Sequence, residues 1–311
     1  DEDAEAAPSA ASASCLAETQ SQGRAAVASK KLATMYGVRP FLDHLFSVWC
    51  GNAVHTFPYV LRWIATTIAE PWRKLKTALV LKSPPQSGKG LILHLLSVLM
   101  GAKYFSQPKS LDDVTVKEFN EHLLGTCLLL FVDEAYWGGD KKAKGALKKL
   151  ITEKWLNIGQ KYQVGYKAEN QFNLVLATNE PKAVSMDIGA ARFLVLDLAE
   201  TYAGTTDDPI QKSAWMGRVA ATDPQTLCNY IHGVDCSGWS ATNLPSTSAT
   251  EDQLISSFDP EIRFLFEALE DPTRLAEARV KSTKVFDDKS LSRAKIYELY
   301  SALFVSRAAP P

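Results

Sequence analysis

Polar side chains that follow apolar runs in this sequence have the chemistry needed to bind and split a triphosphate. Lys89 follows the run at 78–81 after a short polar turn, Asp133 and Glu134 end a second run, and Asn179 follows a third. A lysine neutralises phosphate oxygens, a carboxylate holds Mg²⁺ or activates water, and an amide hydrogen-bonds a phosphate or the attacking water. Ligands bind outside the carboxyl ends of parallel strands, so these side chains are expected at one edge of a sheet.

The turn that contains Lys89 has the character of a phosphate-binding loop. An apolar run precedes it and an apolar helix is expected over 91–100, so backbone N–H groups and the helix N-terminus can face an anion. The usual pattern is G-x-x-x-x-G-K-[ST]. Here Ser83 replaces the first glycine and Gly90 replaces the hydroxyl residue, which removes one expected Mg²⁺ ligand. The candidate phosphate cradle is Ser83, Pro84, Pro85, Gln86, Ser87, Gly88, Lys89 and Gly90. The alternative is an ordinary strand–loop–helix connection with a chance Gly-Lys pair.

The acidic pair ends a near-continuous apolar run at 127–133, the kind of run found in strands that are buried on both faces. A short strand over 102–105 and an amphipathic helix over 111–124 are expected before it. Asp133 would hold Mg²⁺ on the phosphates, and Glu134 would orient or deprotonate the attacking water. The alternative is a solvated pair of acids at a strand end.

Two further polar residues flank later apolar runs. Asn179 follows the strand expected over 172–178, where it either contacts the γ-phosphate or the attacking water, or caps the turn. Arg192 precedes the run at 193–198. It is either a surface salt-bridge residue or a finger that reaches the phosphates of a neighbouring subunit.

The segment 140–167 is strongly basic, with eight lysines and two acids in a chain of formal net charge −1. A helix with solvated lysines is expected over 141–153. The alternating stretch 156–166 contains glycines and predicts a hairpin that carries Lys161 and Lys167 near its turn. A cationic, aromatic-bearing hairpin suits contact with the phosphate backbone of single-stranded nucleic acid.

The chain is expected to have four parts. Residues 1–35 are acidic and rich in Ala and Ser, which predicts a disordered linker. Residues 36–75 form a helical N-terminal layer, and Pro58 opens its main helix. A P-loop core spans 76–200, and a helical C-terminal region spans 201–311.

Bulk properties restrict the class of protein. With 311 residues and a near-neutral charge, the chain can bury a large core, and its total charge favours no partner. The five cysteines are scattered, which indicates reduced thiols in an intracellular setting. No stretch reaches the ~18 apolar residues of a membrane span, so no membrane partner is expected. The acidic, Ala-rich start has no secretory signal, and the initial Asp indicates a processed fragment.

In this order, the motifs resemble those of superfamily 3 (AAA+-like) helicases. The chain is most similar to the helicase domain of phage-, plasmid- and virus-type primase-helicases and primase-polymerases. The resemblance is carried by SPPQSGKG (83–90), LLLFVDEAYWGGDKKAKGALKKLITE (128–153), QKYQVGYKAEN (160–170), LVLATNEP (174–181) and ARFLVLD (191–197). Segments 208–232 and 244–258 match more weakly, and 291–304 is similar to the start of a winged-helix-like tail.

The resemblance implies an α/β P-loop NTPase fold with a five-stranded parallel sheet, a helical N-terminal layer and a helical or winged-helix-like C-terminal region. It implies ATP and Mg²⁺ as cofactors. It also implies roles for individual residues. Lys89 would bind the β- and γ-phosphates, and Asp133 and Glu134 would be the metal-binding and water-activating acids. Lys161 would be the basic residue that contacts DNA, Asn179 the phosphate sensor and Arg192 the trans-acting arginine.

The same resemblance implies a homo-oligomeric ring, most often a hexamer, on single-stranded or forked DNA, with a primase or polymerase domain preceding it in the parent chain. The family commonly has two adjacent arginines, and here Ala191 stands in place of the first. A rival hypothesis is a DNA-binding or assembly module that no longer hydrolyses nucleotide, which Gly90 and Ala191 favour. A second rival is a small-molecule P-loop kinase, against which the basic hairpin argues.

Overall fold

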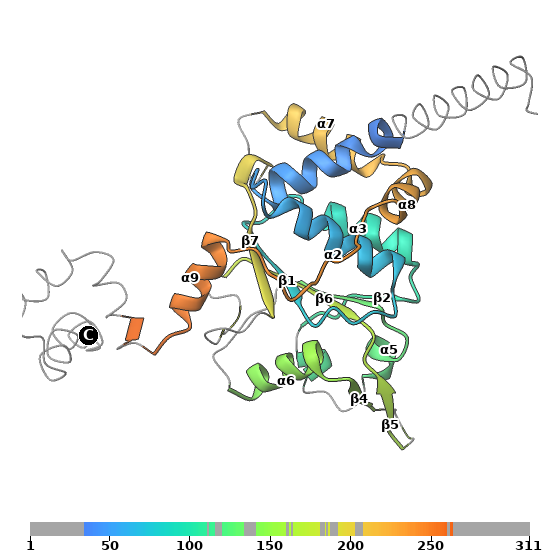
Figure 1. Cartoon of the computed structure of the whole chain (residues 1–311), viewed down its shortest axis with the longest axis vertical. Coiled ribbons are helices and arrows are strands. Elements are labelled where there is room, and N and C mark those ends of the chain that lie inside the picture. The colour runs from blue at the N-terminus through green and yellow to red at the C-terminus, as the bar shows by residue number, and fades with distance from the viewer. Residues whose placement is uncertain are drawn as a thin grey trace, which may run out of the picture.

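The central element of the fold is a five-stranded parallel sheet with the order β2-β3-β6-β1-β7 (Figure 1). The computed structural model describes residues 34–110, 112–115, 120–133, 141–159, 162, 164–180, 184, 186, 192–202, 208–259 and 262–263. The strands are β1 (Ala78–Lys82), β2 (Phe105–Ser106), β3 (Leu129–Val132), β6 (Asn173–Thr178) and β7 (Phe193–Asp197). The α/β class and the five-stranded parallel sheet expected from the sequence are confirmed.

Strand β1 lies inside the sheet, between β6 and β7. Leu81 is paired with Ala177 on one side and with Leu196 on the other. Residues 78–81 and all of β6 are buried, which explains their uninterrupted apolar character, because a parallel sheet is covered on both faces. Since β6 also pairs with β3, the carboxyl ends of β1, β6 and β3 lie side by side.

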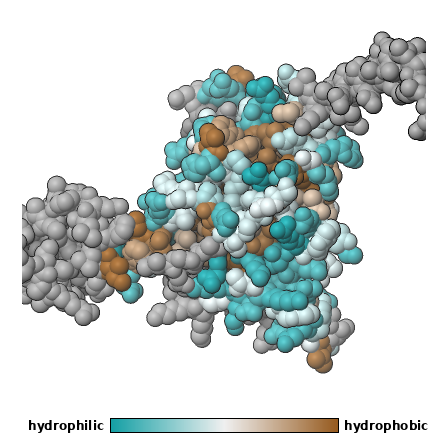
Figure 2. All heavy atoms as spheres, in the orientation of Figure 1, coloured by the Kyte–Doolittle hydropathy of each residue, from teal (hydrophilic) through white to brown (hydrophobic). Residues whose placement is uncertain are grey.

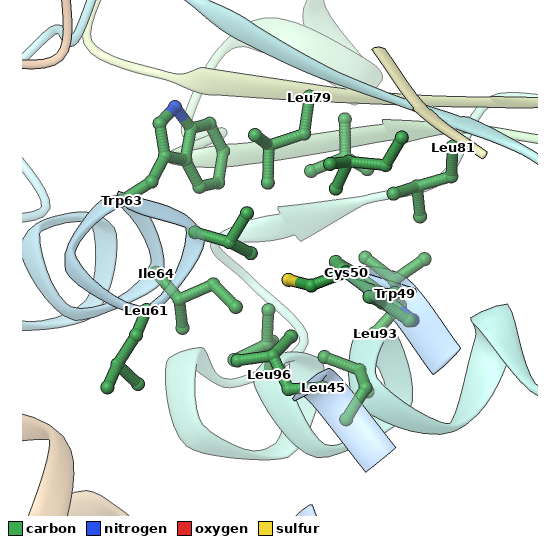
Figure 3. Close-up of a cluster of buried hydrophobic side chains, with 14 of the residues drawn as sticks. Leu45, Trp49, Cys50, Leu61, Trp63, Ile64, Leu79, Leu81, Leu93 and Leu96 are labelled. Atoms are coloured by element: carbon green, nitrogen blue, oxygen red, sulfur yellow. The ribbon is translucent and has the colours of Figure 1, made fainter. Parts of the chain in front are cut away.

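Helices on one face of the sheet enclose the larger of two hydrophobic cores. They are the helix at 34–44, which continues as the π-helical turn η1 (Leu45–Trp49), and then α2 (Phe57–Ala69), α3 (Lys89–Met100), α7 (Pro209–Ala220) and α8 (Pro224–His232). Figure 3 shows side chains of η1, α2, α3 and β1 packed together, among them Trp49, Trp63 and Leu81. This core fixes α3, and with it the loop at 83–88, against β1.

The second core lies on the opposite face, under α4 (Asp112–Thr115), α5 (Glu121–Leu124) and α6 (Lys141–Thr152), with α9 (Ser248–Ser256) beside β7. The single helix expected over 111–124 is wrong, because α4 and α5 are separate. Asn120, just before α5, has a φ of −119°, and its Oδ1 accepts a hydrogen bond of 3.0 Å from the Gly159 N–H. That contact with a distant loop outweighs the helical pattern.

The strand expected over 102–105 begins only at Phe105. Gly101 ends α3 with a φ of +82°, and the Tyr104 N–H donates to the Gly101 carbonyl at 3.0 Å, which closes a turn over these residues. The resulting β2 has only two residues and pairs with β3 at the margin of the sheet.

The expected hairpin is present as β4 (Trp155–Ile158) paired antiparallel with β5 (Tyr166–Glu169). Lys167 is the second residue of β5, opposite Asn157, and so lies in a strand rather than near the turn. Figure 1 shows the hairpin projecting from the end of the molecule beyond α6.

A half-buried lysine ties the base of the hairpin to the sheet. The Lys74 Nζ donates to Asn170 Oδ1 and to the Leu150 carbonyl, each at 2.9 Å, and to the Phe172 carbonyl. The Asn170 Nδ2 donates to the same Leu150 carbonyl at 2.8 Å. Burial lowers the pKa of Lys74 to about 7, while three oxygen acceptors stabilise its charged form. This network joins α6, β5 and the residues just before β6.

The outer edge of β7 is covered by the segment that leads into α9. The Val195 N–H donates to Thr250 Oγ1 at 3.1 Å, and Thr247 Oγ1 donates to the Val195 carbonyl at 2.8 Å. Two threonine hydroxyls therefore satisfy the backbone groups that a further strand would use. In the part of the chain that the structure describes, no helix combines the length and apolar character needed to cross a membrane.

Candidate nucleotide-binding site

Three predicted site residues that lie far apart in the sequence meet at the carboxyl edge of the sheet. The Lys89 Nζ lies 2.9 Å from Asp133 Oδ1 and 3.5 Å from Asn179 Oδ1. Lys89 begins α3 just after β1, whereas Asp133 and Asn179 directly follow β3 and β6. Because β6 lies between β1 and β3, the strand end that carries Asn179 lies between the ends of the other two strands. The convergence expected from the strand ends is therefore present.

The loop before α3 has the backbone conformation of an anion-binding turn. Gln86 and Gly88 have positive φ values of +61° and +88°, and Gly88 is the N-cap of α3. Successive residues that alternate between right- and left-handed conformations turn their N–H groups toward one concave side, and the helix N-terminus adds positive potential there. A non-glycine residue at positive φ stores strain of about 1 kcal/mol or more, as binding loops often do.

The two departures from the usual pattern are both accommodated. The backbone at Ser83 has no positive φ, and its N–H donates to the Thr178 carbonyl at 3.1 Å, so glycine is not required there. A Cβ placed on Gly90 would have nothing within 4 Å. The site therefore has room for a hydroxyl at position 90 although the sequence supplies none.

Two buried serines of the loop have hydroxyl groups with no hydrogen-bond partner among the described residues. They are Ser83 Oγ and Ser87 Oγ, on side chains that are 3% and 0% exposed. A buried hydroxyl without a partner costs about 1–3 kcal/mol. The remaining members of the cradle, Pro84, Pro85 and Gln86, lie nearer the surface. Unsatisfied polar groups beside a turn of N–H donors fit a site whose ligand brings many oxygens.

One described carboxylate, that of Asp133, is an oxygen ligand of the kind that Mg²⁺ prefers. Among the described residues, no three His, Cys, Asp or Glu side chains cluster to hold a metal ion on their own. Mg²⁺ commonly uses one or two carboxylates together with substrate phosphates and water. Asp133, whose side chain is 37% exposed, offers one such carboxylate. Glu134 lies outside the described residues.

A histidine that the sequence analysis did not single out packs directly under the loop. His44, at the end of the helix at 34–44, is fully buried and its Nε2 lies 3.2 Å from the Gly88 carbonyl oxygen. The Trp215 Nε1–H of α7 donates to His44 Nδ1 at 3.1 Å. Burial lowers the pKa of His44 to about 4, against a smaller opposing effect of the Gly88 contact, so the imidazole is neutral at neutral pH. No motif marks either residue in the sequence.

Close packing requires glycine at position 88. A Cβ there would lie 2.7 Å from His44 Cε1 and 2.9 Å from Met216 Cε, and the φ of +88° strains any other residue. The glycine of the motif is therefore fixed by the helices beneath it as well as by the turn.

Arg192 is not brought to this site. Its carbonyl accepts from the Ala78 N–H at 2.8 Å, which places it at the start of β7 beside the start of β1. Lys89 follows the opposite end of β1. At about 3.3 Å per residue, a five-residue strand separates the two edges by roughly 16 Å.

The hairpin also lies away from the nucleotide site. Its base adjoins Asn170, just before β6 begins, whereas Asn179 follows the other end of that strand. Lys167 is exposed, and Lys161 lies outside the described residues. The described residues near the tip are unusually exposed: Tyr162 at 90% and Val164 at 92%. Figure 2 shows a small hydrophobic group projecting where Figure 1 places this tip.

Comparisons with known proteins bear on the fold. The model of a family described as a family of unknown function (DUF5906) matches residues 81–192, the segment between β1 and Arg192. No curated protein matches the sequence.

Two similar solved structures are described as the apo structure of the NrS-1 C terminal region and its A form. They are 17% and 16% identical to this chain, with TM-scores of 0.63 and 0.61. The alignments cover 86% and 87% of this chain and 62% of each of those chains, so the chain spans less than two thirds of their length. At this identity the likeness establishes a shared fold.

Proposed function

We propose that this chain is an ATP-hydrolysing DNA helicase of the superfamily 3 type, which acts in replication. The observation that carries the proposal is the meeting of Lys89, Asp133 and Asn179 beside a left-handed turn at a helix N-terminus. A phosphate-binding turn, a cation, a carboxylate and an amide at one sheet edge are the groups that phosphoryl transfer to water requires.

Each side chain then has a role in hydrolysis. Lys89 exchanges its ion pair with Asp133 for the β- and γ-phosphate oxygens, and Asp133 becomes available as a ligand. Mg²⁺, when bound, neutralises charge that develops on the phosphates. Glu134 orients or deprotonates the attacking water, and Asn179 hydrogen-bonds that water or the γ-phosphate. Lys89 is only 15% exposed in its present ion pair, so its charge acts in a partly desolvated site.

Contact with single-stranded DNA is assigned to the β4–β5 hairpin. Trp155 and Tyr166 are 52% and 40% exposed, and Tyr162 near the tip is almost wholly exposed. Aromatic rings stack on bases of any sequence, while lysines such as Lys161 and Lys167 contact phosphates. Strand β6 joins the base of this hairpin to Asn179, so one buried strand connects the DNA-binding and nucleotide-binding ends.

We also propose that the chain forms a ring, most simply a hexamer, and the position of Arg192 supports this. An arginine at the far edge of its own sheet cannot complete its own nucleotide site, but it can stabilise the transition state in a neighbouring subunit. We further propose that a primase or polymerase domain works with this chain, as in the replication proteins that its motifs resemble.

The direct test measures phosphate release from ATP and Mg²⁺, with and without single-stranded DNA, for wild type and Lys89→Ala. We expect DNA-stimulated turnover in wild type and a loss of about 100-fold or more in the variant, because a charge on the transferred phosphoryl group is left without its partner. Lys82→Ala is the matched control, since Lys82 ends β1 and, among the described residues, forms an ion pair with Asp197 alone, at 3.4 Å. It should retain wild-type turnover.

The rival functions predict different results. Equal background rates in wild type and Lys89→Ala, together with DNA binding, would leave a binding or assembly module without turnover. Turnover that needs a small-molecule acceptor and does not respond to DNA or salt would indicate a kinase.

A further inference from the structure

We propose that His44 is a positioning residue for the phosphate-binding loop, and that Trp215 of α7 holds it in the one tautomer that can do this. The inference rests on the proposed nucleotide site. It adds to that site two residues that follow no motif and that lie 171 positions apart in the chain.

The hydrogen bonds determine which imidazole nitrogen carries the proton. An indole N–H can only donate, so His44 Nδ1, 3.1 Å from Trp215 Nε1, must be the acceptor. In a neutral imidazole the proton then resides on Nε2, which donates to the Gly88 carbonyl oxygen at 3.2 Å. The other tautomer would place two donors against each other and a lone pair against a carbonyl oxygen.

The Gly88 carbonyl is thereby held from two directions. It accepts from the Leu91 N–H at 3.1 Å, within the first turn of α3, and from His44 Nε2. In a planar trans peptide the C=O and the following N–H point in opposite directions. Fixing the Gly88 oxygen toward His44 therefore turns the Lys89 N–H away from it, which is the orientation that a phosphate-binding turn needs.

Helix α7 supplies more than one contact to this arrangement. The rings of His44 and Trp215 are stacked with centroids 6.5 Å apart, and the neighbouring Met216 approaches the site of a Gly88 Cβ. The Arg218 guanidinium lies 5.3 Å from the centre of the Trp215 ring. The loop is thus supported by a helix that follows the sheet in the chain, and a movement of α7 would be transmitted to the Gly88 peptide.

The test uses the full chain and two measurements. The first is amide hydrogen exchange of the 83–91 segment without nucleotide, and the second is the Kd for ADP by calorimetry. We expect His44→Phe and Trp215→Phe to exchange faster in this segment, and to raise the Kd roughly tenfold, because each leaves the Gly88 carbonyl less constrained. His44→Gln, which keeps a donor toward Gly88, should recover most of both losses.

Trp63→Phe is the matched control. Trp63 also has a buried indole N–H, which donates to Thr77 Oγ1 at 3.2 Å, but it is not part of the loop network. This variant should lose about as much overall stability as Trp215→Phe. The exchange rate of the segment 83–91 and the Kd for ADP should stay at their wild-type values.

The outcomes separate this inference from the proposed function. If exchange of 83–91 is the same in His44→Phe, Trp215→Phe and Trp63→Phe, the positioning role is wrong, whatever the nucleotide affinity. If wild type does not bind ADP at all, the proposed function fails, while faster exchange in the two loop variants alone still supports the positioning role.

Discussion

At the scale of single residues, the most informative position is Gly90, where the proposed phosphate-binding loop lacks the hydroxyl of the usual pattern. A Cβ there meets nothing within 4 Å, so serine fits without rearrangement. Serine is also favoured over glycine in a helix by about 0.5 kcal/mol. The absent hydroxyl therefore reflects no steric requirement of this loop.

We predict that Gly90→Ser strengthens the dependence of nucleotide binding on Mg²⁺. The hydroxyl restores the ligand that the usual pattern places there, so the ratio of Kd values without and with Mg²⁺ should rise several-fold, on the order of 3 to 10. Calorimetric titration with ADP measures it. Gly90→Ala is the control, because it shares the helical gain but has no hydroxyl. The same ratio in both variants would contradict a metal ligand at this position.

Residue types and strand ends were sufficient to predict much of the site. Lys89, Asp133 and Asn179 could be found because each follows an apolar run, and parallel strands bring such positions to one edge. His44 and Trp215 could not be predicted in this way, because neither directly follows a strand. Their contacts depend on how α7 packs against the helix at 34–44. A lone buried histidine has no local pattern.

At the scale of elements, long apolar runs were predicted well and short segments poorly. The inner strands and α3 are specified by their own sequence, because burial on both faces demands continuous apolar residues. The segment from 111 to 124 was predicted as one helix, but its break at Asn120 depends on a hydrogen bond to Gly159 in the hairpin. Local patterns cannot report such a distant partner.

The element that most depends on one side chain is the base of the hairpin. We predict that Lys74→Met destabilises the protein by about 2–4 kcal/mol, because Asn170 Oδ1 and the Phe172 carbonyl lose the Lys74 Nζ donor while remaining buried. Chemical denaturation measures the free energy of unfolding. As this free energy falls, the rate of amide hydrogen exchange in the segment 155–169 should rise.

Lys154→Met provides the comparison for that prediction. Lys154 lies at the start of the same hairpin, but it is exposed and its ion pair with Glu169 is 3.8 Å long. Its removal should change the free energy of unfolding by no more than about 0.5 kcal/mol. Equal effects of the two substitutions would mean that the buried network does not hold the hairpin.

At the scale of the whole molecule, the proposed nucleotide site lies at the carboxyl ends of the strands, whereas Arg192 lies at the opposite ends. We predict that Arg192→Ala and Lys89→Ala are each inactive alone, and that a one-to-one mixture regains about a quarter of wild-type ATP turnover. In a randomly mixed ring, that share of interfaces pairs an intact Lys89 with an intact Arg192 from its neighbour. Phosphate release after mixing and reassembly measures it.

Two results would contradict an arginine supplied by the neighbour. Full activity of Arg192→Ala would show that the arginine is dispensable, and a mixture that stays inactive would show that it acts within its own subunit. Because residue 191 is alanine, no arginine directly before Arg192 can substitute for it in this experiment.

The covered margins of the sheet restrict how such a ring can be built. The margin strand β2 offers only two residues, and at β7 the backbone of Val195 is already bonded to Thr247 and Thr250. Ring formation by extension of the central sheet is therefore disfavoured, because the backbone groups of Val195 are already used and β2 offers too little backbone for a stable ladder. Side-chain contacts between subunits suit a ring whose interfaces change during each cycle of hydrolysis, because they can rearrange without breaking a backbone ladder.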